Sequence, residues 1–299
     1  MISEKLAEQG ISKYIDSLLN NSELRNDCSV IITKCDAKEY LNSVEPALES
    51  LTARYYESTI NSAKYTGYTV DITLFEFYFK MKDSCSQAYA ILGTAQSDSQ
   101  MDNKVEENAN YIAGNNPISD KDVIDNLGIA VFKDDILVGE LTGLDSICHI
   151  IVNNELRYCT ISVPNTQNET SPIDLGLTSE KSPKCSVDFS DTGPIIHLNF
   201  YLVAHGLSLD SNINYDSQEQ LNFIENTASQ YLQDKINNYL YKTSKEFNSD
   251  ICGFGKYALK HYLTLNEWYS SNWLENYKNS TFDVHVHLKV KSGNLFDKS

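Results

Sequence analysis

Two histidines near the C-terminus come nearest, in type and spacing, to a metal site. His285 and His287 stand two apart in residues 282–290, whose alternating pattern predicts a strand, so both rings lie on one face. With a third ligand such a pair could bind zinc. No Asp, Glu or Cys is spaced to complete the set, and a solvated strand face explains the pair more simply. His197 and His205 also share one face of a predicted strand, but ~26 Å separates them at the usual rise per residue, too far for one metal.

Seven cysteines are scattered along the chain, and none forms a C-x-x-C pair. This spacing signals neither a zinc knuckle nor a dithiol redox pair. Most of them stand beside apolar residues, so we interpret them as small buried hydrophobic side chains. They are Cys28, Cys35, Cys85, Cys148, Cys159, Cys185 and Cys252.

The tripeptide Gly253-Phe254-Gly255 has the G-x-G form of a nucleotide-binding loop. It follows a predicted helix, whereas the dinucleotide fingerprint joins a strand to a helix. We therefore expect the glycines to end the helix by adopting a positive φ, which glycine does without steric cost. We expect Phe254 to pack between helices. The chain contains no nucleophile elbow, Walker loop, zinc-protease motif or EF-hand loop. We predict no catalytic residue, no cofactor and no enzymatic activity.

The composition argues against several classes of partner. The 299-residue chain has a formal net charge of −17, which disfavours binding to nucleic acid or to an anionic membrane surface. No apolar run approaches the ~20 residues of a membrane span. The N-terminus lacks the basic and apolar regions of a signal peptide, so we expect a soluble chain as given.

The longest element that the sequence predicts is one helix in the second half of the chain. Apolar side chains recur at steps of three and four residues over 216–247, and Asp216 or Ser217 can cap the start. Such a helix is about 48 Å long and must lay its apolar face against a sheet. Strands at 160–163, 185–189, 194–209 and 282–290 supply that sheet, whereas the polar segment 164–181 predicts irregular structure. The apolar positions of the helix are Leu221, Ile224, Ala228, Leu232, Ile236, Leu240 and Phe247.

A hairpin over residues 127–141, turning at Asp134 and Asp135, is the clearest local prediction in the first half. An aromatic helix over 72–81, capped by Thr69 or Asp71, lies before it. Further strands are predicted at 29–33 and 89–93, and further helices at 3–24, 37–41, 46–64 and 144–151. We predict a multi-domain α+β fold in which each domain is a mainly antiparallel sheet packed with helices. The domains are a partial first domain (1–64), a middle domain (65–156) and a C-terminal domain with the long helix (157–299).

Two segments carry a family resemblance. Residues 127–139 match the pattern G-x-A-V-F-K-x-D-x-L-V-G, with Gly128, Phe132 and Gly139 in place. Residues 250–255 match D-x-F-G-F-G after the long helix, with Trp268 and Trp273 beyond, although Cys252 replaces an aromatic residue. The chain resembles the C-subunits of bacterial spore germination receptors, the Ger(x)C lipoproteins. A weaker match covers residues 6–30, and the resemblance leaves His285 and His287 unexplained.

The resemblance implies a non-enzymatic interaction scaffold in a nutrient germinant receptor. It implies a lipid-anchored subunit on the outer face of the spore inner membrane, working with an A subunit and a membrane-embedded B subunit. Family members begin with a secretion signal, a lipobox cysteine and further strands, so we expect an N-terminally truncated chain. The motif residues are expected to be structural, with Phe254, Trp268 and Trp273 packing the last domain.

Two alternatives remain beside the scaffold. The first is a module that binds a small germinant in a cleft between the middle and last domains. The second is a metal-dependent hydrolase that uses His285 and His287.

Overall fold

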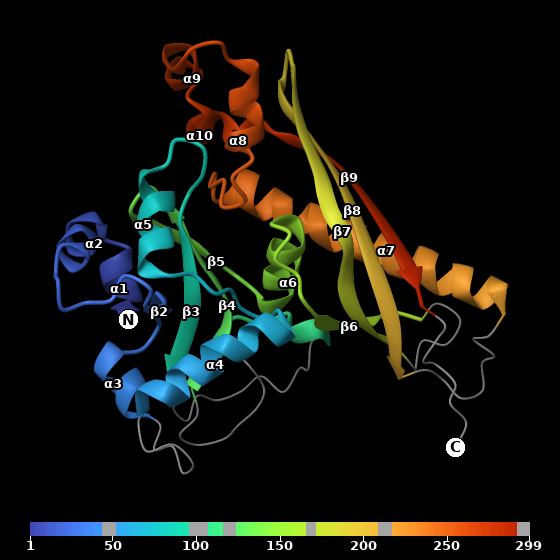
Figure 1. Ribbon diagram of the computed structural model, residues 1–299, viewed down its shortest axis with the longest axis horizontal. Coiled ribbons are helices and arrows are strands. Elements are labelled where there is room, and N and C mark those ends of the chain that lie inside the picture. Colours follow the sequence, from blue (N-terminus) through green and yellow to red (C-terminus); the bar gives the residue numbers. More distant parts are fainter. Residues whose placement is uncertain (44–51, 96–106, 116–123, 166–171, 209–216, 292–299) are drawn as a thin grey trace.

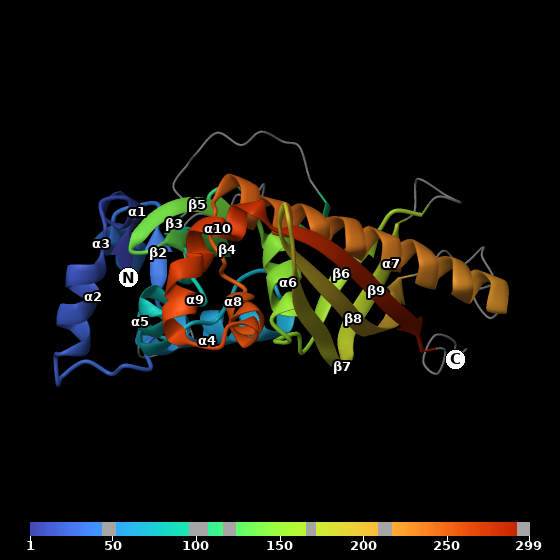
Figure 2. The ribbon, with the colours of Figure 1, turned by 90° about the horizontal axis from the view of Figure 1, so that it is seen from above.

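The structure is a computed structural model that describes residues 1–43, 52–95, 107–115, 124–165, 172–208 and 217–291. Two sheets lie side by side, and helix α6 (Gly143–Val152) stands between them in both views (Figures 1 and 2). The predicted α+β class is confirmed, because helices pack on both sheets. Each sheet is mixed, since each contains parallel and antiparallel neighbours.

The first sheet has five strands in the order β1-β2-β3-β4-β5. Parallel pairing joins β1 (Ile2–Ser3), β2 (Ile31–Thr33) and β3 (Tyr89–Ala95). The predicted hairpin is present as β4 (Ile124–Lys133) and β5 (Ile136–Leu141), and Asp134 takes the left-handed turn position with φ 55°. Strands from the predicted first and middle domains thus share one sheet, and the division into domains stays a prediction.

Helices that precede the hairpin flank the first sheet. They are α1 (Glu4–Ala7), α2 (Ser12–Leu19), α3 (Ala37–Asn42), α4 (Thr52–Thr66) and α5 (Leu74–Lys82), with a 3₁₀ turn η1 (Glu107–Ala109) farther on. The predicted caps of the aromatic helix α5 are wrong, because Thr73 and Glu76 form a reciprocal capping box at its start. Thr69 instead donates its hydroxyl to the Gly128 carbonyl oxygen at 3.1 Å.

The second sheet has the order β6-β7-β8-β9. Its strands are β6 (Cys159–Val163), β7 (Ile173–Ser190), β8 (Gly193–Ser208) and β9 (Thr281–Val290), and only the β8–β9 pair among them is parallel. The prediction of irregular structure over 164–181 is wrong from Ile173 onward. Leu175 and Leu177 face the core, while the following polar side chains face solvent and are held in the strand by pairing with β8. Residues 166–171 lie outside the described part of the chain.

Helix α7 (Gln218–Tyr241) covers one face of the second sheet (Figures 1 and 2). Ser217 caps it by accepting the Gln220 N–H at 3.2 Å, and the alternative cap Asp216 lies outside the described residues. The helix does not run unbroken to 247 as predicted, because a π-helical turn, η2 (Lys242–Glu246), follows. The hydroxyls of Thr243 and Ser244 both donate to the Leu240 carbonyl oxygen, which competes with regular helical bonding.

The chain then builds an aromatic cluster at one end of the molecule from short helices (Figure 1). These are α8 (Gly255–Ala258), α9 (Leu265–Ser271) and α10 (Trp273–Asn276), with 3₁₀ turns η3 (Leu259–His261) and η4 (Tyr277–Asn279). Phe254, Trp268 and Trp273 are each at most 4% exposed. The two indole rings lie 6.1 Å apart, and Phe254 lies 6.4 Å from the Tyr277 ring. The rings that the sequence singled out therefore pack together.

Phe254→Ala is expected to lower the free energy of unfolding by about 3–5 kcal/mol, because a large buried ring leaves a cavity. Equilibrium urea unfolding measures the change. The matched control is Phe75→Ala, since the Phe75 side chain is 50% exposed and its loss should cost no more than about 0.5 kcal/mol. Equal stabilities for the two variants would contradict the assignment.

Candidate functional site

The segment Asp250–Gly255, called here the Asp250 loop, folds around one buried carboxylate. Asp250 is fully buried. Its two oxygens accept N–H groups from Gly253 at 2.8 Å, Phe254 at 3.1 Å, Gly255 at 2.9 Å and the Trp273 indole at 2.9 Å. Burial raises the pKa of the Asp250 carboxyl, while the four donors oppose that rise by favouring the charged form.

The two glycines of this loop shape it and do not end the long helix as predicted. Asn248 takes the left-handed position after the helix, with φ 46°. Gly253, with φ 73°, bends the chain so that three successive N–H groups converge on the carboxylate. A Cβ on Gly255 would stand 2.5 Å from the Cys85 carbonyl oxygen, so only glycine fits there.

The Asp250 loop is bonded directly to the first sheet. The Gln87 N–H donates to the Asp250 carbonyl oxygen at 2.9 Å. The Ser249 hydroxyl donates to the Phe132 carbonyl oxygen, and the Trp268 indole donates to the Ser84 hydroxyl at 2.9 Å. The loop therefore fastens the C-terminal helices to the strands β3 and β4.

The hairpin motif contributes the other side of this contact. The Phe132 ring is fully buried and meets Phe77 edge-on at 5.1 Å. Gly139 leaves room for Phe247, since a Cβ there would stand 2.2 Å from that ring. Gly128, with φ 92°, lies so close to the Leu141 carbonyl oxygen that a Cβ would stand 2.1 Å away. The structure thus brings together two motifs that lie more than a hundred residues apart in the sequence.

The histidine pair lies elsewhere, on the solvent face of β9. His285 Nε2 lies 3.0 Å from an Asp283 carboxylate oxygen, and the other Asp283 oxygen lies 2.9 Å from His197. His287 stacks on the Tyr201 ring with centroids 5.0 Å apart. Sequence reasoning missed Asp283, although strand alternation places it on the same face as both histidines. Among the described residues, no group of three or more His, Cys, Asp or Glu side chains is arranged to hold a metal.

All seven cysteines are free thiols. Cys85, Cys148 and Cys159 are buried, and burial raises the pKa of all three thiols. Cys35, Cys185 and Cys252 are half-buried. The exception is Cys28, which is exposed because it lies in the bend between α2 and β2, so the interpretation as a buried side chain is wrong there.

A cleft of about 310 Å³ lies where α5, the end of α6, β7, β8 and the Asp250 loop meet. We call it the joint cleft, and its polar lining includes Lys80, Asn153, Glu155, Cys252 and Lys256. Its volume lies at the small end of the range for ligand pockets. Its walls come from segments that lie far apart in the sequence. No local sequence pattern therefore indicates that these residues line one cleft.

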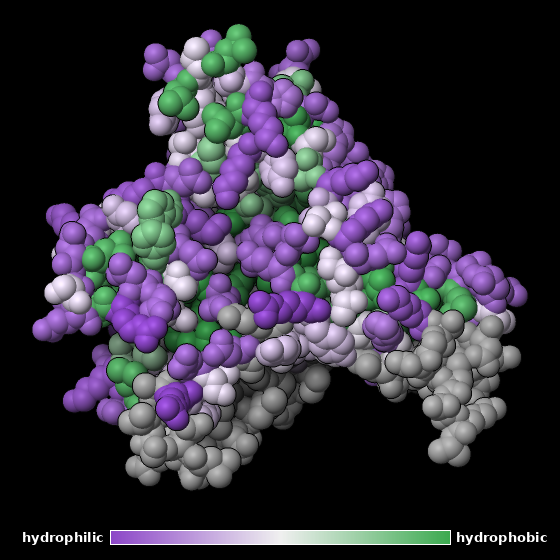
Figure 3. All heavy atoms as spheres, viewed as in Figure 1, coloured by the Kyte–Doolittle hydropathy of each residue, from purple (hydrophilic) through white to green (hydrophobic). Residues whose placement is uncertain are grey.

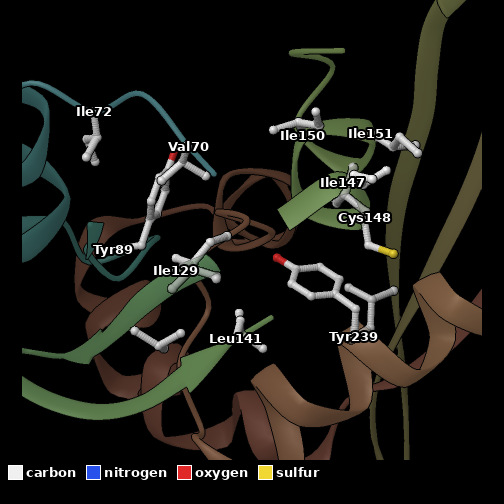
Figure 4. Packing of buried hydrophobic residues seen from close by; sticks show 14 of the residues in the cluster. Val70, Ile72, Tyr89, Ile129, Leu141, Ile147, Cys148, Ile150, Ile151 and Tyr239 are labelled. Carbon is white, nitrogen blue, oxygen red and sulfur yellow. The ribbon is translucent and has the colours of Figure 1, made fainter. Parts of the chain in front are cut away.

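A buried chain of polar groups connects two of the residues that line the joint cleft. The Asn153 amide nitrogen only donates, so His149 Nε2 accepts from it at 2.9 Å and Nδ1 carries the proton toward the Tyr239 hydroxyl at 2.7 Å. Tyr239 in turn lies 3.0 Å from the Cys252 sulfur. Figure 4 shows Tyr239 of α7 among apolar side chains of β4, β5 and α6. Burial lowers the pKa of His149 to about 3, so the imidazole is neutral at pH 7.

Two family models match the chain. The model described as "Spore germination B3/GerAC like, C-terminal" matches residues 127–293, and "Spore germination protein N-terminal domain" matches residues 1–94. The chain belongs to the GerAC family of spore germination proteins. This membership confirms the resemblance to Ger(x)C proteins, so the GerAC-type chain is a C-subunit of a germinant receptor. Both motifs lie inside the region that the C-terminal model matches.

The GerAC-type chain also has a solved structural neighbour, described as "Crystal Structure of the GerBC protein". The two folds superpose with a TM-score of 0.66 at 12% sequence identity, covering 97% of this chain and 77% of that chain. A likeness at this identity concerns the fold alone. Among curated proteins, no sequence matches the chain. In the described part of this GerAC-type chain, no helix is long and apolar enough to cross a membrane.

Asp250→Asn is expected to lower the free energy of unfolding by about 3 kcal/mol, because the amide NH₂ faces N–H donors and loses charge-assisted hydrogen bonds. Urea unfolding at pH 7 measures this loss. Asp283→Asn serves as the matched control, since Asp283 lies on an exposed strand face and should leave stability close to that of the wild type. A fully stable Asp250→Asn protein would contradict the role given to the carboxylate.

His149 predicts a pH dependence of stability. Its pKa is about 3 in the folded chain and about 6.5 when unfolded. Between these values only the unfolded state binds the proton, so this group's contribution to stability is lost as the pH falls. The loss is about 1.4 kcal/mol per pH unit between about pH 6 and pH 4. His149→Gln keeps a donor and an acceptor without this proton, so its stability should fall less steeply in unfolding measured across that range. Identical slopes would refute the assignment.

Proposed function

We propose that this C-subunit is a non-enzymatic scaffold that contacts the A and B subunits when the receptor triggers germination. The observation that carries the proposal is a set of exposed apolar side chains at the end of the molecule formed by η3 and α9. Leu263, Leu265 and Tyr269 are 94%, 63% and 63% exposed, and we call them the apolar tip. Exposed apolar groups of this kind are typical of protein interaction sites. Figure 3 shows apolar surface gathered at this end.

A second apolar surface lies on helix α5. Phe75 and Phe79 are 50% and 54% exposed, and their rings contact each other edge-on at 4.4 Å. Both rings line an open hollow that also includes Leu19 and Tyr78. A subunit that bridges two partners needs two such surfaces, and the apolar tip and the α5 surface supply them in this proposal.

The proposal includes a place for the subunit. Membership of a germinant receptor family supports association with the spore membrane. We place the subunit at the outer face of the inner membrane, attached through the N-terminal lipid anchor of full-length family members. In that position the described residues lie outside the bilayer, where their surfaces are free to contact the other subunits.

The double variant Leu263→Ser/Leu265→Ser is expected to reduce recovery of at least one of the A and B subunits about tenfold, because the interface at the apolar tip loses two apolar contacts worth together more than 1.4 kcal/mol. The measurement is affinity purification of tagged protein from detergent-solubilised spore membranes, with both subunits quantified. Tyr65→Ser is the control, since Tyr65 on α4 is also 63% exposed. Wild-type protein that recovers neither subunit, or a double variant that recovers both fully, would contradict the proposal.

A further inference from the structure

The joint cleft carries two ammonium groups and no strong anionic partner for either of them. Lys80 on α5 is half-buried, and its Nζ lies 4.9 Å above the centroid of the Tyr89 ring. Lys256 on α8 folds back over the Asp250 loop, so that its Nζ lies 3.7 Å from the place of a Cβ on Gly253. Neither ammonium forms a hydrogen bond or an ion pair with any other described residue. We propose that these two lysines bind the carboxylate of a small aliphatic acid in the joint cleft.

The electrostatics of the cleft favour an anion. Burial, and next the neighbouring charge of Lys256, lower the pKa of Lys80, so its ammonium is held in an unfavourable environment. An anion bound between the two groups would favour both ammonium groups and so offset the two effects. Glu155 also lines the cleft, so two positive charges face one negative charge and leave a net charge of +1. This contrasts with the charge of −17 on the whole chain.

Glu155 and the buried carboxylate of Asp250 both act to raise the pKa of Lys80, but neither forms an ion pair with Lys80 or Lys256 among the described residues. The Asp250 oxygens are fully occupied by four N–H donors behind the loop, and the carboxylate is buried away from the cleft. The Cys252 thiol, which also lines the cleft, has a raised pKa because of its burial, so it stays uncharged at pH 7. The two lysines therefore have no ion-pair partner among the described residues that would compete with a ligand.

The remaining walls set the chemical class of the ligand. Val152, Leu198 and Pro183 contribute apolar surface to the same cleft. A branched aliphatic tail would lie against them, while the carboxylate lies between the two ammonium groups. A cavity of about 310 Å³ has room for a small acid of roughly six carbons.

Isothermal titration of the purified chain with 4-methylpentanoate tests the inference. The matched probe 3-methylbutylamine has the same tail with an ammonium in place of the carboxylate, and it should not bind. Lys80→Gln and Lys256→Gln should each weaken binding of the acid about tenfold, the effect of losing one charge-assisted hydrogen bond. Lys260→Gln is the control, because Lys260 lies four residues beyond Lys256 and does not line the cleft.

Three results would overturn the inference: no heat with the acid at millimolar concentration, equal binding of the amine, or undiminished binding by both lysine variants. Circular dichroism and urea unfolding show whether each variant is folded, and Lys256→Gln alters an exposed side chain, so it remains informative if Lys80→Gln unfolds. The inference does not rest on the scaffold proposal. Titration of the isolated chain reports on the cleft, whereas recovery of the A and B subunits reports on the apolar tip, so either can fail alone.

Discussion

The fold depends on one buried negative charge and the four N–H groups that bind it. An unpaired carboxylate costs several kcal/mol to bury, so the Asp250 loop is stable only in the conformation that aims its backbone at Asp250. One donor is the indole of Trp273, so the same carboxylate also holds the short helices that follow the loop against it. The Asp250 carbonyl oxygen simultaneously accepts from Gln87. A single residue therefore fixes the local turn, the aromatic cluster and the attachment to the first sheet.

Polar contacts, one buried and one partly buried, also hold α6 against α7 and η2. Lys242 of η2 lies 2.7 Å from the Asp145 carboxylate on α6, and His149 on α6 bonds to Tyr239 on α7. Apolar packing alone tolerates small shifts, whereas these bonds are satisfied in one arrangement of α6 against α7. The joint cleft opens beside this contact, so its shape is set by the same bonds. A rigid joint is a suitable place for a specific site, because little ordering remains to oppose binding.

Much of the fold follows from local patterns, and the site does not. Local sequence patterns are sufficient to predict three features: the hairpin, the apolar face of α7 and the alternation in β8. The strand β7 was missed in part, because residues from 178 to 184 are polar apart from Pro183 and are held in the strand by pairing with β8. The parallel pairing of β1 with β2 joins residues that lie far apart in the sequence, so no local pattern predicts it. No local pattern indicates the joint cleft, since Lys80 and Lys256 come together only through the tertiary fold.

The position of β9 in the second sheet affects when that sheet can form as the chain is synthesised. It lies parallel to β8, and the paired residues His197 and Asp283 are 86 positions apart. Such a pair cannot close through a hairpin, so the loop entropy of that whole segment must be lost before any pairing stabilises it. Until residues 281–290 have been synthesised, β8 has an open edge and α7 lacks part of the surface it covers. The parallel β8–β9 pair, and the packing of α7 on β9, therefore form only after residues 281–290 have been synthesised.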